Sequence, residues 1–239
     1  MSEYENMTYG RAIPSAEAQA FDQGLRTYMI GVYQFMALGV ALSGALALVL
    51  SMQPAIMQMI WATPLKWVVI FAPVAVGLYT QIRIHSLSPG AAQALFWLYA
   101  ALVGASLSIV FAVFTDASVA RVFLITAVAF GALSLYGYTT KRNLSAWGSF
   151  LFIGMIGVLI AGLVNIFLQS SALNFAVSAI GVLVFAGLTA YDTQQIKAMY
   201  YQAADETTAS RYAVLGALWL YISFVAMFQF LMSLLGDRE

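Results

Sequence analysis

One acidic residue, Asp192, lies at the edge of a long apolar stretch, in the segment Gly-Leu-Thr-Ala-Tyr-Asp-Thr-Gln at 187–194. An ionisable side chain at the centre of a bilayer costs about 2.5–3.5 kcal/mol or more, so such a residue is a functional candidate by default. Two interpretations are open. Asp192 is either an acid at the water interface where a helix ends, or a carboxylate partly buried between helices that gates a path or binds a cation such as calcium.

Arg83 is the basic residue that could act on this carboxylate. It directly follows the second apolar stretch and is expected on the same side of the membrane as Asp192. There it could pair with Asp192 when the bundle is closed, or serve only as a positively charged anchor on the inner side. His85, two residues further on, is expected to be a polar residue beside the membrane rather than a sensor.

The residue types needed for most enzymatic sites are missing. The chain has no cysteine and a single histidine, which excludes thiolate nucleophiles and leaves no His-Glu-x-x-His helix for a metalloprotease. No second acid within a span could share a proton with Asp192 as in an intramembrane aspartyl protease. We therefore expect no enzyme and no cofactor, and because ten basic residues balance ten acidic ones, no nucleic-acid partner.

The elements that carry these residues are membrane-spanning helices. The 239 residues are 62% hydrophobic and 8% charged, with a mean hydropathy of +0.87, whereas soluble domains carry about 25% charged residues. Because a spanning helix needs roughly 20 apolar residues, the sequence predicts an all-α, polytopic bundle of seven transmembrane helices. A polar tail at 1–28 precedes a single domain at 29–239, with spans at about 29–50, 64–82, 90–114, 118–138, 147–168, 173–191 and 212–236.

Three helix starts and one helix break are recognisable locally. Thr63 and Ser88 each precede a proline, which predicts a capping hydroxyl followed by Pro at the first helical position. Asp116 is expected to cap the fourth span in the same way. The stretch 143–191 has no charge and is too long for one helix, so the polar Gln-Ser-Ser at 169–171 is expected to divide it into a hairpin.

Basic residues in the loops predict the orientation. With the N-terminus in the cytoplasm, the inner segments hold Arg11, Arg26, Arg83, Lys141, Arg142, Lys197 and Arg211, and the outer ones hold Lys66, Arg121 and Arg238. The C-terminus is then outside, unless the seventh span is re-entrant.

Uncharged polar residues within the spans need hydrogen-bond partners in lipid and are expected to face the bundle interior. These are Gln34, Asn165, Ser178, Thr189, Ser223 and Gln229.

Two segments together resemble the Bax-inhibitor family, the transmembrane Bax-inhibitor-motif proteins, and in particular a bacterial member. They are Ser-Leu-Tyr-Gly-Tyr-Thr-Thr-Lys-Arg-Asn-Leu at 134–144 and Ala-Tyr-Asp-Thr-Gln-Gln-Ile-Lys at 190–197, and the resemblance runs from about residue 28 to 236. It implies a bacterial inner-membrane protein with a central last helix and a role in stress responses. It also implies a pH-sensitive calcium leak channel in which two aspartates share a proton near an arginine, with Asp192 as the first aspartate and Arg83 as the arginine.

The chain departs from that pattern at the second aspartate. The last helix of the family typically reads Leu-Tyr-Leu-Asp-Phe, and residues 220–224 read Leu-Tyr-Ile-Ser-Phe, so Ser223 takes the aspartate position. Two close carboxylates repel each other when both are ionised, and a serine adds no such repulsion. We therefore expect gating that is less sensitive to pH or that occurs at lower pH, and a weaker preference for calcium, which takes six to eight oxygen ligands.

An alternative role is open, that of a non-conducting regulator in the membrane that acts on a partner such as a membrane protease or the stress machinery. The N-terminal tail, with Tyr4 and Tyr9, is a candidate contact segment. A monomer embedded in the lipid bilayer is the expected state.

Overall fold

The computed structural model describes residues 15–238, with side chains from Gln23 onward. This part of the chain consists of helices joined by turns and short loops, and its only β-structure is one isolated bridge, between Phe114 and Arg238. The helices are α1 (Ser15–Ser51), α2 (Pro54–Trp61), α3 (Leu65–Arg83), α4 (Pro89–Leu107), α5 (Val110–Val113), α6 (Asp116–Thr139), α7 (Ser145–Leu168), α8 (Ser171–Gln202) and α9 (Glu206–Leu235).

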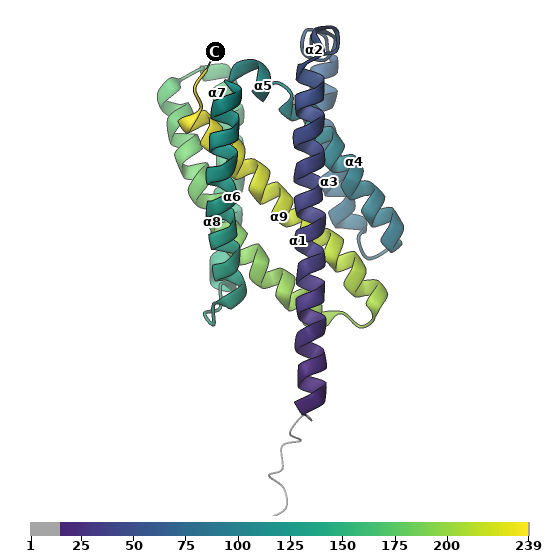
Figure 1. Ribbon diagram of the computed structural model, residues 1–239. Helices are drawn as coiled ribbons and strands as arrows, with labels where there is room; N and C mark the ends of the chain where they lie inside the picture. Colours follow the sequence, from purple (N-terminus) through teal and green to yellow (C-terminus); the bar gives the residue numbers. More distant parts are fainter. Residues whose placement is uncertain (1–14, 239) are drawn as a thin grey trace, which may run out of the picture.

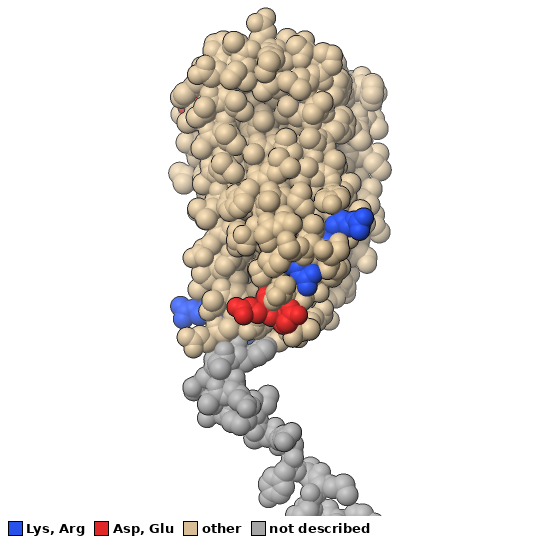
Figure 2. All heavy atoms as spheres, turned by 90° about the vertical axis from the view of Figure 1, so that its right-hand side faces the viewer, with Lys and Arg blue, Asp and Glu red and all other residues tan. Residues whose placement is uncertain are grey.

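Seven helical segments of the described chain are long and apolar enough to cross a membrane, at 23–51, 65–83, 89–113, 116–139, 145–168, 171–202 and 206–235. The predicted seven-helix bundle is therefore confirmed. The starting end of α1 and the C-terminus lie at opposite ends of the bundle, as an odd number of crossings requires (Figure 1). On the face drawn in Figure 2, nearly all charged side chains gather at the end where α1 begins, and an uncharged surface covers the rest.

The last span crosses the bundle completely and is not re-entrant. At 30 residues, α9 is about 45 Å long at 1.5 Å per residue, and it runs obliquely between the other helices (Figure 1). It packs most extensively against α8 and also contacts α1, α6 and α4. Several of its large side chains, among them Leu218, Leu220, Tyr221 and Met227, are fully buried. The core of the protein is thus arranged around α9.

Three helices extend several residues beyond their predicted bounds, and one of them is α9, which begins at Glu206 rather than near residue 212. Helix α1 begins at Ser15, so the predicted tail at 1–28 is helical in its second half, whereas Tyr4 and Tyr9 lie outside the described residues. Helix α8 ends at Gln202 rather than near residue 191. Asp192 therefore lies inside a helix that continues past it, which favours a carboxylate between helices over an acid at a helix end.

Two of the three predicted capping side chains accept a backbone hydrogen bond at the start of their helix. The Ser88 hydroxyl accepts a hydrogen bond from Ala91 N at 3.2 Å, with Pro89 in the first turn of α4. The Thr63 hydroxyl likewise accepts a hydrogen bond from Leu65 N, the first residue of α3, at 3.2 Å, although Pro64 itself takes the N-cap position. Asp116, by contrast, is not the cap of α6. Thr115 is, with its hydroxyl accepting from Ser118 N at 3.3 Å, and this leaves the Asp116 carboxylate without a capping role.

Candidate functional site

Asp192 of α8 and Ser223 of α9 meet across the most extensive helix pair of the bundle. The Ser223 hydroxyl donates a hydrogen bond to Asp192 Oδ2 at 3.2 Å. Ser223 is only 2% exposed, while Asp192 is half-buried. The two candidate residues are thus brought together, and the pair joins α8 to the central helix.

The Asp192 carboxylate lines a cavity of about 490 Å³ bounded by α3, α7, α8 and α9. Six residues supply polar groups to its wall, namely Gln81, Ser149, Tyr191, Asp192, Gln195 and Ser223. The rest of the wall is apolar and includes Phe152, Phe185 and Trp219. A half-buried carboxylate beside neutral oxygens can attract a cation and can gain or lose a proton.

Residues on both sides of Asp192 fix the position of α8. On one side, Tyr191 lies against α7 where Gly148 leaves room for it, because a Cβ at Gly148 would lie 2.7 Å from the Tyr191 hydroxyl oxygen. On the other side, the Thr193 and Ser134 hydroxyls hydrogen-bond at 2.9 Å, and Ser134 hydrogen-bonds to Tyr33 at 2.6 Å. This chain of hydroxyls connects α8 through α6 to α1.

The next residues of α8 hold the loop between α6 and α7. Gln194 accepts from Leu144 N at 2.8 Å and donates to Arg142 O at 2.9 Å. Lys197 donates to Tyr138 O at 3.4 Å and lies over the Tyr138 ring. The two segments that carry the resemblance, 134–144 and 190–197, therefore bind each other, and together they orient the helix turn that bears Asp192.

Arg83 is not brought to Asp192. It is exposed at the end of α3, and no ion pair joins it to Asp192 within residues 15–238. Gln81 of the same helix lines the cavity instead. Side chains two residues apart on a helix point about 200° apart, so a helix that presents Gln81 to the cavity cannot also present Arg83 to it. The expected Arg83–Asp192 pair is absent from this conformation.

Sequence reasoning missed Gln81 and Ser149, which the fold adds to the cavity. Both are polar residues of otherwise apolar helices, and a polar side chain within a predicted span was the only feature of the sequence that pointed to either of them. His85, by contrast, lies away from the site, with its ring against Tyr212 and its backbone oxygen accepting from Arg211 at 2.6 Å.

The opposite side of α9 is anchored just as firmly. The Tyr221 hydroxyl hydrogen-bonds to Ser43 of α1 at 2.5 Å, and Ser43 also donates to Ala100 O of α4 at 2.7 Å. Tyr221 and Ser223 are two positions apart, so one turn of α9 is bound to α1 and α4 on one face and to α8 on the other. A displacement of this turn would disturb both contacts.

No group of three or more His, Cys, Asp or Glu side chains that could hold a metal ion occurs in the part of the chain that the structure describes. The cavity offers one carboxylate, two amide oxygens and three hydroxyls. A hard cation that binds oxygen ligands could pass such a site with water completing its shell, whereas tight binding would require more carboxylates. The donor set therefore fits transient contact with a cation.

Known proteins resemble this chain over nearly its whole length. Residues 25–239 match the family described as "Inhibitor of apoptosis-promoting Bax1". An uncharacterized protein of Caulobacter vibrioides is 45% identical, with 98% of each chain covered. The inner membrane protein YbhL of Escherichia coli is 44% identical over 90% of this chain and 94% of its own length. A protein of Rickettsia prowazekii is 44% identical over 94% of this chain and 95% of its own.

Proposed function

Since this chain belongs to the Bax-inhibitor family of multi-pass membrane proteins, we propose that it forms a cation leak path across the bacterial inner membrane that is gated at Asp192. Calcium is the proposed transported ion. The observation that supports this role is the half-buried carboxylate in a polar cavity, hydrogen-bonded to the central helix. The chain has no enzymatic role in this proposal.

The Asp192–Ser223 contact is the proposed gate. An ionised Asp192 attracts a cation into the cavity and accepts the Ser223 hydrogen bond that holds α8 to α9. Protonation removes the charge and changes this hydrogen bond, so it alters both the attraction for a cation and the contact between the two helices. The oxygens of Gln81, Gln195 and Ser149 line the same cavity and would replace part of the ion's hydration shell as it passes.

The test is calcium flux into proteoliposomes across a pH series, with wild-type protein and Asp192→Asn compared. We expect wild-type flux to vary with pH and Asp192→Asn flux to be independent of it. Glu206→Gln is the matched control, because Glu206 is an exposed acid at the start of α9 outside this cavity, and it should behave as wild type. Absence of flux above empty liposomes at every pH, from folded protein, would refute the channel.

Ser223→Asp probes the departure from the family pattern. A second carboxylate beside Asp192 restores like-charge repulsion, so the pH response of the flux should become steeper or move toward neutral pH. A wild-type flux that already titrates near neutral pH, and that Ser223→Asp leaves unchanged, would contradict the proposed effect of Ser223.

If no flux occurs, the alternative role as a regulator of a membrane protease or of the stress machinery becomes the better proposal. Its test is deletion of residues 1–14, which leaves the described part of α1 intact. Loss of partner binding with an unchanged fold would support that role and locate the contact in the tail.

A further inference from the structure

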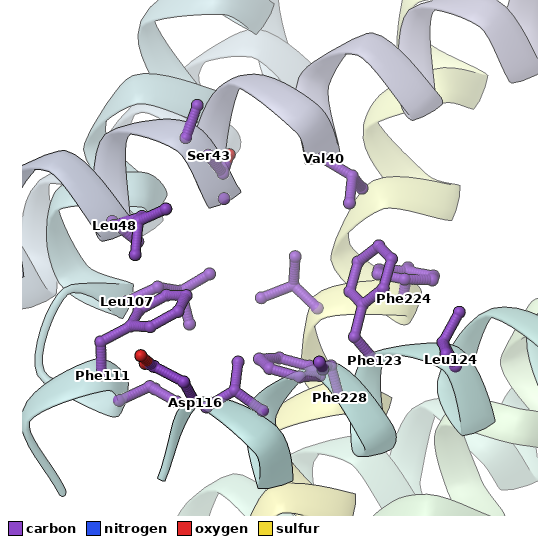
Figure 3. Close-up of a pocket in the computed structure, with 17 residues that line it drawn as sticks. Val40, Ser43, Leu48, Leu107, Phe111, Asp116, Phe123, Leu124, Phe224 and Phe228 are labelled. Carbon is purple, nitrogen blue, oxygen red and sulfur yellow. The ribbon is translucent and has the colours of Figure 1, made fainter. Parts of the chain in front are cut away.

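A second cavity lies on the other side of α9, between α1 and α6. Helix α1 packs on α4 and α9, while α6 packs on α8 and α9, so α9 forms the floor of the seam between α1 and α6. Near the end of the bundle that holds the C-terminus, this seam opens into a cavity of about 470 Å³. Figure 3 shows Phe224 and Phe228 of α9 lining it together with side chains from α1, α5 and α6.

The lining of this second cavity is almost entirely hydrocarbon. Its wall is made of aliphatic and aromatic side chains, glycine and alanine, and its polar groups come from Ser43 and Asp116. The Ser43 hydroxyl is buried and already hydrogen-bonded to Tyr221. At the mouth, Leu48 and Leu124 are exposed on helices that cross the membrane, so the cavity opens sideways into the lipid. Lipid tails are the apolar molecules present at such an opening.

Asp116 provides one charge at the rim. It is the first residue of α6, it is exposed, and its carboxylate points toward the cavity in Figure 3. Thr115 caps the helix in its place. Within residues 15–238 the Asp116 side chain forms no ion pair. A free carboxylate at a membrane surface favours a cationic group.

We propose that this cavity binds one acyl chain of an aminophospholipid, whose ammonium group lies at Asp116. Its volume falls within the roughly 300–1,000 Å³ of small-molecule pockets. The bound chain contacts Phe224 and Phe228, which belong to the same helix as Ser223, so the lipid occupies the face of α9 opposite the Asp192 cavity. The site does not depend on ion conduction.

Gly44 of α1 allows the cavity to be filled without disturbing the fold. It lines the cavity, and a Cβ built at this position meets nothing within 4 Å. Gly157 of α7 is the matched control, because it is also exposed, also has open space around it, and lines no cavity described here. Gly44→Leu should therefore block the acyl chain, whereas Gly157→Leu adds the same side chain to a plain lipid-facing surface.

The experiment uses full-length protein in vesicles that contain phosphatidylethanolamine with a photoreactive group at the end of one acyl chain. After illumination, labelled peptides are identified by mass spectrometry. We expect labelling concentrated on the cavity residues of α1, α6 and α9. Gly44→Leu should abolish most of this labelling, because the added side chain occupies the space of the acyl chain. Gly157→Leu should leave it unchanged.

Asp116→Asn tests the head-group contact. With the acyl chain held constant, the wild type should label more strongly with the phosphatidylethanolamine probe than with a phosphatidylglycerol probe. Loss of the carboxylate should reduce this preference by about two- to fivefold, as for an exposed ion pair. Labelling that is spread evenly over all lipid-facing helices, or that Gly44→Leu does not change, would come from the bulk lipid around the protein. Either result would overturn the proposal.

Discussion

Helices α7 and α9 both cross the membrane, yet they occupy opposite environments. Helix α7 has the most apolar stretch of the described spans, and only 11% of that stretch is buried, whereas 67% of the corresponding stretch of α9 is buried. In a soluble protein the more apolar helix would be the more buried one. Here the solvent is lipid, so a uniformly apolar helix is stable at the periphery.

The difference shows what makes a helix central in this fold. Helix α9 carries polar groups that need partners, such as Tyr221, Ser223 and Ser233, and each is hydrogen-bonded to a neighbouring helix. Because lipid gives apolar helices no reason to associate, packing and polar contacts decide which helix lies inside. Four predictions test this contrast, from the largest expected effect to the smallest.

Truncation of a leucine should distinguish the two helices most strongly. Leu218 of α9 is fully buried and Leu163 of α7 is 54% exposed. Leu218→Ala should lower the free energy of unfolding by about 2–5 kcal/mol, as cavities in packed cores do, and Leu163→Ala by less than about 1 kcal/mol. The measurement is reversible unfolding in mixed detergent micelles. Equal losses for both variants would mean that α7 is packed against something else.

Two glycines of α7 should respond oppositely to the same change. A methyl group at Gly148 would clash with Tyr191, whereas one at Gly157 meets open space. Gly148→Ala should destabilise by about 1–3 kcal/mol and alter the flux assay through Tyr191 and Asp192. Gly157→Ala should stabilise by up to ~1 kcal/mol, because alanine is the better helix former. If Gly148→Ala left the free energy of unfolding unchanged, Tyr191 would not depend on its close contact with α7.

The C-terminal ends of the two helices also differ. Helix α7 ends at Gln169 in the left-handed conformation, with φ of 49°, which glycine adopts at less cost. Gln169→Gly should therefore stabilise the protein by up to ~1 kcal/mol in the same unfolding assay. Helix α9 ends at Gly236, where a Cβ would touch the Phe114 ring, so Gly236→Ala should destabilise. A destabilising Gln169→Gly would point to a contact of the glutamine side chain.

The N-terminal ends of α7 and α9 should differ in how their stability responds to acid. Thr208 N donates to Asp205 at 2.6 Å, and this hydrogen bond lowers the pKa of Asp205 below its usual value. The stabilisation is therefore present at neutral pH and is lost as pH falls through the lowered pKa. The N-cap residue of α7, Leu144, offers no side-chain cap, and Ser145 N donates instead to the Asn143 amide, which does not titrate. The start of α7 should therefore not show this loss.

Amide hydrogen exchange of the first turns, corrected for its intrinsic pH dependence, measures this difference. Protection at the start of α9 should fall in acid while protection at the start of α7 stays constant. Asp205→Asn keeps a good cap that does not titrate, so it should remove the pH dependence. A wild-type response that persists in Asp205→Asn would assign the effect to another group.

The sequence predicts the number of spans and nearly all of their bounds, because a hydrocarbon layer imposes one strong requirement on every crossing helix. It does not predict which helices are neighbours. Polarity within a span was therefore only a partial guide to the interior. Thr189, Ser178 and Ser223 are buried as expected, whereas Gln34 and Gln229 are exposed. Because the sequence does not show which face of α3 lies against α8, Arg83 was expected beside Asp192, and Gln81 was overlooked.

The position of α9 has a consequence for biosynthesis. The chain is made from its N-terminus, so the helix at the centre of the bundle leaves the ribosome after the other six described spans. The six spans before it enter the membrane while Ser43 and Asp192 still lack their partners Tyr221 and Ser223. Arrival of α9 completes this bundle, and the ion pair between Arg121 and Asp237 forms only after residue 237 has been translated.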